Sequence, residues 1–272
     1  MTTSSRASSG ELTGHDVASA LQWYMDIGWD EAVLAVAQDR LAHDPSVSIQ
    51  APLVAPHAVA AQKPPSVEPL GTAEARGAVG SLLSGVSSLD ELKQALGKFT
   101  GMAISKTATN MVFGDGNPAA RLMVIGEVPD AEDDKIGRAF AGEAGQLLDK
   151  MMAAIGLSRH SEEAAKAVYL TQVLNWRPPG NRTPSAAEID LSTPFLEKHI
   201  DLVKPDVLLF MGSVPVRALL GRTESMTKLR GNWFEYKSIP CLVSYPPSFL
   251  LKSPAKKRES WEDLQALQQK LV

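Results

Sequence analysis

Four short apolar runs alternate with longer helix-like stretches through most of the second half of this chain. The apolar runs cover residues 122–125, 168–174, 207–211 and 240–244. The helix-like stretches cover residues 142–155, 187–203, 214–220 and 255–271. Apolar runs of this length are typical of strands buried on both faces, and their alternation with amphipathic helices is typical of a parallel sheet. We therefore predict an α/β fold, a three-layer α/β/α arrangement around a central four-stranded parallel sheet, with ligands bound beyond the carboxyl ends of the strands.

Composition narrows the class of protein. Of the 272 residues, 44% are hydrophobic and 21% charged, which is ordinary for a globular protein. No run approaches the about 18 apolar residues of a membrane span, and the N-terminus lacks the apolar core of a secretory signal, so we expect a cytoplasmic protein. The net charge of −4 argues against non-specific coating of nucleic acid but leaves room for a local basic patch. The single cysteine, Cys241, excludes a disulfide framework, a CxxC pair and an all-cysteine metal site.

Three regions differ in composition. Residues 1–43 contain apolar positions spaced for one or two amphipathic helices, with Gly28 as a plausible break. Residues 44–86 are rich in proline and alanine and carry little charge, which predicts a flexible linker. Residues 87–272 contain all of the strand and helix pattern described above and form the predicted α/β domain.

The segments that follow the predicted strands carry the most specific motifs. They read GEVPD at 126–130, GRAFAGEAGQLL at 137–148, RPPGNRTP at 177–184, LRG at 229–231 and SYPPSFLL at 244–251. In this order, and over about residues 99–267, the chain resembles the family 4 uracil-DNA glycosylases, the iron–sulfur type within the uracil-DNA glycosylase superfamily. The resemblance implies a base excision repair enzyme that hydrolyses the N-glycosidic bond of uracil in DNA.

The resemblance also implies roles for residues of the first motifs. Phe140 matches the aromatic residue that stacks on the flipped uracil, although it could be an ordinary core phenylalanine. Glu127 matches the acidic residue that faces the sugar, where a carboxylate stabilises positive charge or positions water; its alternative role is to cap the following helix turn. Gly126 and Ser248 complete the expected base-binding set. The acidic residues at 132–134 are interpreted as a solvated helix start, with a role in the chemistry as the alternative.

Three pocket positions depart from the family pattern. Gln172 replaces the asparagine that reads the uracil edge; it keeps an amide donor and acceptor but displaces them by about 1.5 Å. Asp130 places an anionic side chain where the family has glycine and keeps room for substrate. Pro246 replaces the histidine of the closing motif, which is similar to an oxyanion donor to the uracil carbonyl. Proline supplies neither an imidazole nor a backbone N–H at that position.

The four family positions that ligate the iron–sulfur cluster are also changed. Aligned without gaps, they fall on Met102, Ser105, Trp176 and Ser192. None of these side chains can replace a thiolate ligand of iron. We therefore expect no metal and no cofactor, with Met102 and Trp176 filling the volume of the cluster by apolar packing.

Basic residues near the C-terminus indicate DNA contact. The predicted phosphate contacts are Arg177 and Arg182 near the pocket mouth together with Lys228, Arg230 and Lys252. The triplet at 256–258 either extends this patch or forms the exposed first turn of the last helix. Leu250 and Leu251 are candidates for the apolar wedge that fills the vacated base stack, or else anchor their loop.

Two hypotheses about function follow. The first is a cluster-free glycosylase acting on uracil or a related deaminated base in single-stranded DNA or in damaged duplex with a flipped base. The second is a catalytically impaired protein of the same fold that binds damaged or abasic DNA or a repair partner. Glu127, Phe140 and the 177–184 loop favour the enzyme, whereas Pro246 and the other two pocket departures favour the binding protein. The N-terminal helical segment carries no chemical motif and suits a tethered partner-binding element.

Overall fold

The computed structural model describes residues 72–271. The predicted helical segment 1–43 and most of the predicted linker 44–86 lie outside the described residues, so these boundaries stay predictions. Within the region predicted as a flexible linker, however, α2 (Thr72–Leu83) is a helix. Its Val79 is buried in the core, and α2 packs on α6 (Ala186–Val203), so burial of an apolar side chain stabilises helix there.

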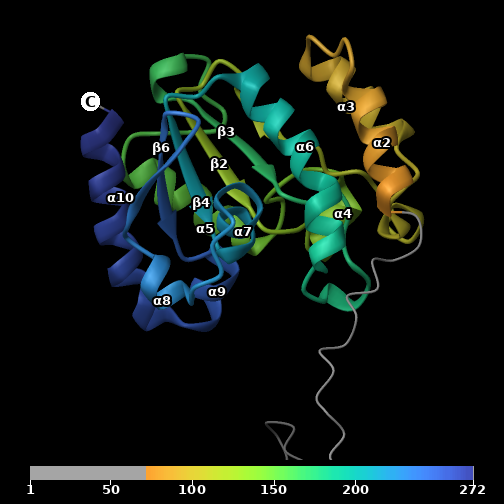
Figure 1. Cartoon of the computed structure of the whole chain (residues 1–272). Helices are drawn as coiled ribbons and strands as arrows, with labels where there is room; N and C mark the ends of the chain where they lie inside the picture. The colour runs from red at the N-terminus through yellow and green to blue at the C-terminus, as the bar shows by residue number, and fades with distance from the viewer. Residues whose placement is uncertain (1–71, 272) are drawn as a thin grey trace, which may run out of the picture. The chain divides into compact units, whose positions relative to one another are not determined.

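The chain forms a six-stranded sheet in the order β1-β3-β2-β4-β6-β5, and its four central strands are labelled in Figure 1. The strands are β1 (Asp115–Gly116), β2 (Leu122–Gly126), β3 (Val168–Gln172), β4 (Val207–Met211), β5 (Trp233–Tyr236) and β6 (Ile239–Ser244). The central pairs β3–β2, β2–β4 and β4–β6 are parallel, which confirms the predicted α/β class and its four parallel strands. The edge strands β1 and β5 pair antiparallel and were not predicted, because one is two residues long and the other is largely exposed.

The remaining helices cover the sheet or connect its strands. The α-helices are α3 (Leu89–Lys98), α4 (Ala131–Ile136), α5 (Glu143–Ala154), α7 (Ser213–Leu220), α8 (Met226–Leu229), α9 (Pro247–Lys252) and α10 (Lys257–Leu271). The 3-10 turns are η1 (Ala103–Lys106), η2 (Ala164–Lys166), η3 (Pro179–Asn181) and η4 (Pro254–Lys256). None of the helices within residues 72–271 is long and apolar enough to cross a membrane.

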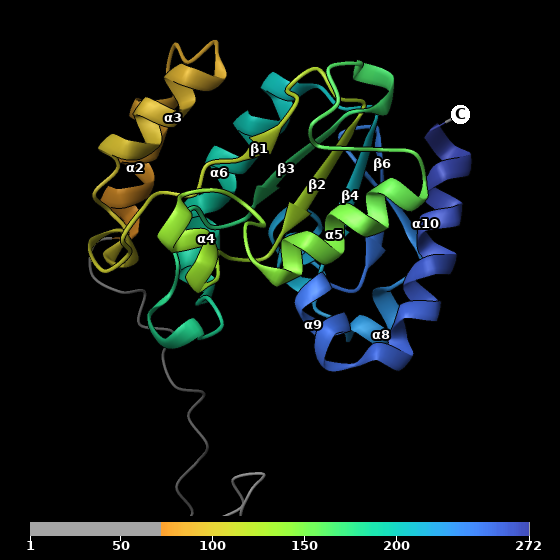
Figure 2. The ribbon, with the colours of Figure 1, turned by 180° about the vertical axis from the view of Figure 1, so that it is seen from behind.

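Alternation of side chains along the strands builds a core on each face of the sheet. Leu122 and Val124 of β2 pack with α5 and α10, and Figure 2 shows α5 lying across that face. Met123 and Ile125 point to the opposite face and pack with α6 and α7, outside which α2 and α3 contact α6. The fold therefore has the predicted three layers, and the carboxyl ends of its four parallel strands meet at one edge.

Candidate active site

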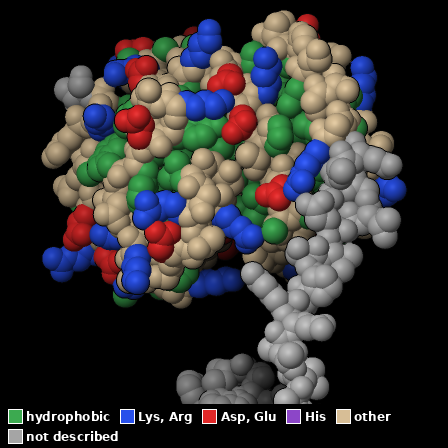
Figure 3. All heavy atoms as spheres, in the orientation of Figure 1, with side chains coloured by type: hydrophobic (Ala, Val, Ile, Leu, Met, Phe, Trp, Pro, Cys, Tyr) green, Lys and Arg blue, Asp and Glu red, His purple; other side chains and the backbone are tan. Residues whose placement is uncertain are grey.

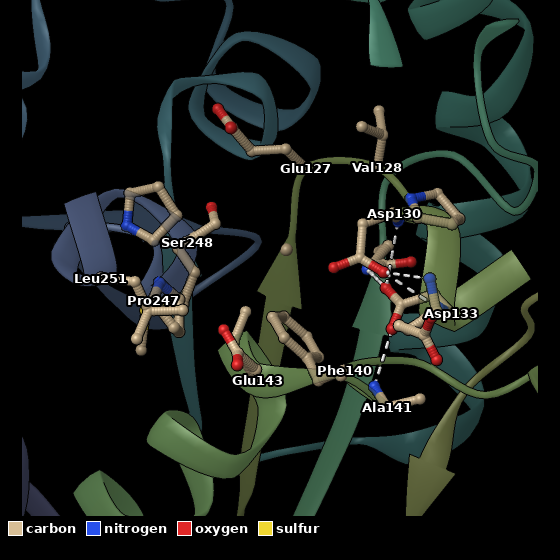
Figure 4. Close-up of a pocket in the computed structure, with 18 of the residues that line it drawn as sticks. Glu127, Val128, Asp130, Asp133, Phe140, Ala141, Glu143, Pro247, Ser248 and Leu251 are labelled. Carbon is tan, nitrogen blue, oxygen red and sulfur yellow. Dashed lines mark hydrogen bonds between the residues drawn. The ribbon is translucent and has the colours of Figure 1, made fainter. Parts of the chain in front are cut away.

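A pocket of about 910 Å³ opens at the carboxyl ends of the parallel strands (Figure 4). Gly126 ends β2, Gln172 ends β3, Met211 ends β4, and Pro246 follows β6, and all four line the pocket. The strand ends thus bring together residues that are far apart in the sequence. This is the position at which parallel α/β sheets bind their ligands.

The Phe140 ring points into this pocket (Figure 4). Its φ of 52° is in the left-handed region, which is costly for a bulky residue, and its neighbours hold it there. The carbonyl of Ala139 accepts a hydrogen bond of 3.1 Å from the buried Arg159 Nη1, and the N–H of Ala141 donates one of 2.7 Å to Asp133 Oδ1. A Cβ on Gly126 would lie 2.5 Å from Phe140 Cζ, so glycine at the end of β2 makes room for the ring.

Gln172 and Asp133 form a buried pair in the wall of the pocket. Gln172 Nε2 donates a hydrogen bond of 2.8 Å to Asp133 Oδ2, whereas Gln172 Oε1 is buried with no hydrogen-bond partner in the described structure. Burial raises the pKa of the Asp133 carboxyl, and the negative charge of Asp130 adds to the rise. The sequence did not single out Asp133, because it stands in an acidic run interpreted as a solvated helix start. That interpretation is wrong for Asp133 and Asp134, which are both buried.

Asp130 lies in the pocket wall and also caps a helix. Its Oδ1 accepts hydrogen bonds of 2.9 Å from the N–H groups of both Glu132 and Asp133, which makes Asp130 the N-cap of α4. From the sequence we expected only an anionic side chain in the space that the family keeps for substrate. The structure adds a local reason for the residue, because an aspartate N-cap satisfies N–H groups that glycine leaves without a partner.

The Glu127 carboxylate lies at the rim of the pocket and turns away from the Phe140 ring in Figure 4. Its Oε1 accepts hydrogen bonds from Ser213 N at 2.9 Å, Val214 N at 3.2 Å and Ser213 Oγ at 3.2 Å. These donors are at the N-terminus of α7, so Glu127 caps a helix distant in sequence rather than the turn that follows it. These hydrogen bonds hold the carboxylate in place, so only its second oxygen is left to interact with a substrate.

The closing motif forms α9 at the other side of the pocket. Pro246 precedes α9, and Pro246, Ser248, Leu251 and Lys252 all line the pocket. Leu250 points the other way and is only 1% exposed, whereas Leu251 is 39% exposed. The prediction of Leu250 as a DNA contact is therefore wrong, because its side chain is part of the protein interior.

The predicted phosphate contacts differ in how far their charges are already neutralised. Arg182 is bidentate on Glu188, at 2.8 and 2.6 Å, and Arg177 donates to Asn181. Arg230 lies within 3.7 Å of carboxylates contributed by α10, so its charge is partly balanced within the protein. Lys228 and Lys252 are exposed and take part in no ion pair among residues 72–271.

The basic patch predicted from sequence is accordingly less positive than its residues suggest. The basic residues named from the sequence end at residue 258, whereas the residues that follow in α10 include the acidic Glu259, Glu262 and Asp263. Two of these carboxylates also pair with lysine and arginine from residues 256–258. On the face seen in Figure 3, Lys and Arg side chains are interspersed with Asp and Glu rather than forming a continuous basic field.

Among the four positions aligned with cluster ligands, Ser105 and Ser192 both lie next to Met102. Met102, Trp176 and Ser192 are buried, and Met102 and Trp176 belong to one apolar core. Ser192 Oγ lies 3.8 Å from Met102 Sδ, and Ser105 Oγ donates a hydrogen bond of 2.7 Å to the Met102 carbonyl. A thioether, two hydroxyl groups and an indole are not ligands that hold an iron–sulfur cluster. These residues do not fit such a group.

Comparison with known proteins gives the relationship of the chain. The profile of the Uracil DNA glycosylase superfamily matches residues 113–265. The type-4 uracil-DNA glycosylase of Thermotoga maritima is 33% identical over 169 residues, which is 61% of this chain and 84% of that protein. The corresponding type-4 protein of Sulfurisphaera tokodaii is 31% identical over 193 residues, 68% of this chain and 85% of its own. A type-5 uracil-DNA glycosylase of Pyrobaculum aerophilum is 32% identical over 148 residues, 50% of this chain and 64% of the relative.

The matched region begins before β1 and ends in α10, so it contains the whole sheet and every strand end that lines the pocket. The chain therefore belongs to the uracil-DNA glycosylase superfamily, and among the members of that superfamily it is similar to the type-4 enzymes named above.

Proposed function

We propose that this protein hydrolyses the N-glycosidic bond of uracil, or of a related deaminated base, in DNA. The observation that carries the proposal is the Phe140 ring facing into a pocket whose wall holds the Gln172 amide. An enzyme that acts on a base must extrude it and hold it between an aromatic surface and hydrogen-bonding groups. DNA with a flipped base, single-stranded or damaged, is the partner that suits this arrangement.

Breaking the bond between C1′ and the base leaves positive charge on the sugar and negative charge on the departing base. In our proposal Glu127, fixed by the N-terminus of α7, faces the sugar with its second carboxylate oxygen and stabilises that positive charge or orients water. Water then gives its hydroxyl to C1′ and its proton to the base. Gly126 and Ser248 line the pocket and complete the set of residues that contact the base.

The residue at position 246 bears on the rate of uracil release that we expect. A donor to the developing base anion typically contributes a factor of about 100 to 1000 in rate, and proline supplies none at this position. We therefore expect slow release of uracil. The same residue favours the alternative proposal, in which the protein binds damaged or abasic DNA, or a repair partner, without turnover.

We propose that the reaction runs without an iron–sulfur cluster, since Met102, Trp176 and Ser192 occupy the family's ligand positions as part of the interior. The protein purified anaerobically should carry no iron at cluster stoichiometry and no absorbance band near about 400 nm. Iron bound at that stoichiometry would contradict this part of the proposal.

The test of function compares four proteins on the same oligonucleotides: the wild type, Glu127→Ala, Pro246→His and the double variant. Release of uracil is measured on single- and double-stranded DNA, beside a gel-shift on abasic DNA. We expect slow release by the wild type and an increase of up to about 100-fold in Pro246→His if the imidazole reaches the base. Glu127→Ala should abolish the release in both backgrounds. Tight binding of abasic DNA with no release, even from Pro246→His, would refute the enzyme and support the binding protein.

A further inference from the structure

Two hydrogen bonds hold the backbone of Phe140, one on each side of the residue. The dihedral angles φ and ψ describe how the peptide group before a residue is turned relative to the peptide group after it. In the group before Phe140, the carbonyl of Ala139 accepts a hydrogen bond of 3.1 Å from Arg159 Nη1. In the group after it, the N–H of Ala141 donates one of 2.7 Å to Asp133 Oδ1 (Figure 4). Because each peptide group is held at one atom, the two bonds together keep Phe140 at its φ of 52°.

The place of the Phe140 ring depends on this backbone conformation. For a residue with a Cβ, the left-handed region is disfavoured by about 5- to 30-fold, so it persists only where contacts hold it. Rotation about the N–Cα bond moves the Cβ and the ring relative to the preceding peptide group. A Cβ on Gly126 would lie 2.5 Å from Phe140 Cζ, so the end of β2 leaves space for the ring where it now lies. A relaxed backbone would therefore withdraw the ring from that position.

Arg159 is held by elements outside the loop that carries Phe140. Its side chain is only 3% exposed. Nε donates a hydrogen bond of 2.7 Å to Asp149 Oδ1 in α5, and Nη1 donates one of 2.9 Å to Asp115 Oδ2 in β1. Nη2 donates to the carbonyl of Gly145 at 3.5 Å, in the first turn of α5. A planar guanidinium can make these contacts and the one to the loop carbonyl at the same time, in one fixed geometry.

We propose that Arg159 is a positioning residue for base binding: its guanidinium ties the carbonyl of Ala139 to β1 and α5, and so keeps the Phe140 ring where it can stack on a flipped base. This inference deepens the proposed function and rests on it. Arg159 does not line the pocket and acts only through Phe140.

Binding of two hydrolysis-resistant ligands tests the inference. One single-stranded oligonucleotide carries 2′-fluoro-deoxyuridine (the uridine ligand), and the other carries a tetrahydrofuran abasic analogue at the same position (the abasic ligand). Arg159→Met removes every donor but keeps a long side chain. With Phe140 free to leave the left-handed region, only a fraction of the molecules presents the ring, so the Kd for the uridine ligand should rise by about 5- to 30-fold. The Kd for the abasic ligand should stay within about 2-fold of the wild-type value, because this ligand has no base to stack.

A double-mutant cycle with Phe140→Ala separates positioning from a general effect on the fold. Alanine has no ring to orient, so Phe140→Ala should by itself weaken binding of the uridine ligand. Adding Arg159→Met to Phe140→Ala should then change the Kd by no more than about 2-fold, although the same substitution has its full effect when the ring is present. A residue that only stabilised the protein would weaken binding equally in both backgrounds.

Two further variants control for loss of charge and loss of stability. Arg159→Lys keeps a positive charge beside the two carboxylates but lacks the planar fork, so it should fold and still raise the Kd for the uridine ligand. It also decides the question if Arg159→Met does not fold. Arg121→Met is the matched control, since Arg121 likewise donates to one carboxylate, Asp206 Oδ2 at 2.6 Å, and to one carbonyl, that of Leu271 at 2.8 Å. This control should lower the Tm and leave both Kd values unchanged.

Three outcomes would overturn the inference. The first is a folded Arg159→Lys with the wild-type Kd for the uridine ligand, and the second is an equal loss of affinity for both ligands in the Arg159 variants. The third is additivity in the double-mutant cycle, or no effect of Phe140→Ala on either Kd. Failure of the proposed function appears separately, as absence of uracil release from hydrolysable DNA by a wild type that still binds the uridine ligand more tightly than Phe140→Ala does.

Discussion

Two adjacent leucines of α9 should respond to the same substitution in opposite ways. Leu250 is 1% exposed and packs in the interior, whereas Leu251 is 39% exposed and lines the pocket mouth. Replacing each by alanine removes the same atoms from neighbouring positions. The pair therefore separates an anchor of the helix from a side chain available to enter DNA.

The cost of each change follows from burial. Leu250→Ala removes a buried side chain and should lower the free energy of unfolding by about 2–5 kcal/mol. For a domain of this size each kcal/mol corresponds to about 2–4 °C in Tm, so we expect a decrease of about 4–20 °C. Leu251→Ala should change the free energy of unfolding by no more than about 0.5 kcal/mol, because its side chain is largely in water.

The functional effect should be reversed. If Leu251 enters the gap left by a flipped base, alanine loses the burial of three carbon atoms, worth at most about 2 kcal/mol or about 30-fold. We expect release of uracil from duplex DNA to fall by about 10-fold and release from single strands to change little, because a single strand has no continuous stack to fill.

The assay measures Tm and the ratio of duplex to single-strand release for both variants. Leu250→Ala, assayed well below its Tm, should keep the wild-type ratio. An equal loss of release on both substrates by Leu251→Ala would refute the wedge. An unchanged Tm in Leu250→Ala would refute the assignment of Leu250 to the interior.

Three further predictions follow from the electrostatics. Lys252→Ala should reduce the slope of log affinity for DNA against log salt concentration by about 0.7–0.9. Arg182→Ala should reduce that slope less, because Glu188 already neutralises the guanidinium. Equal slopes in both variants and the wild type would contradict a phosphate contact. Burial lowers the pKa of His199 to about 3 from its ordinary 6.5. The neutral side chain therefore contributes fully to stability above pH 6.5, and this contribution is lost as the pH falls toward 3. In His199→Gln, the free energy of unfolding measured with urea should decrease less between about pH 7 and pH 4 than it does in the wild type. Burial raises the pKa of the Cys241 thiol to about 12, so a thiol reagent should label the unfolded protein but not the native one, and Cys241→Ala should leave DNA binding unchanged.

Much of the architecture follows from local pattern. The predicted strand at 207–211 coincides with β4, and the predicted helix at 187–203 begins one residue inside α6 and ends with it. Strands buried on both faces are continuous apolar runs, so the sequence shows where they begin and end. The edge strand β5 has only one buried residue of its four, and its pattern is therefore indistinguishable from that of a loop.

Motifs likewise indicated which segments form the pocket, because residues after parallel strands must meet at one edge of the sheet. Glu127 and Phe140, which belong to those motifs, line one pocket together with Gln172. The placing of Phe140 in a left-handed conformation, held through its two neighbours, was not visible in the sequence, since backbone dihedral angles depend on contacts made by the whole loop.

Only the tertiary structure decided what the charged and apolar side chains of the site contact. Asp133 belongs to an acidic run that sequence alone treats as solvated, yet it is buried against Gln172, thirty-nine residues along the chain. From the sequence, Arg230 adds one positive charge to the basic patch, but in the structure three carboxylates of α10 lie close to it. Leu250 and Leu251 are adjacent leucines that the sequence does not distinguish. Because they point to different sides of α9, the first lies in the interior and the second at the pocket mouth. Local sequence determines which elements form, but the burial of these side chains and their contacts across the site depend on how elements distant in the chain pack together.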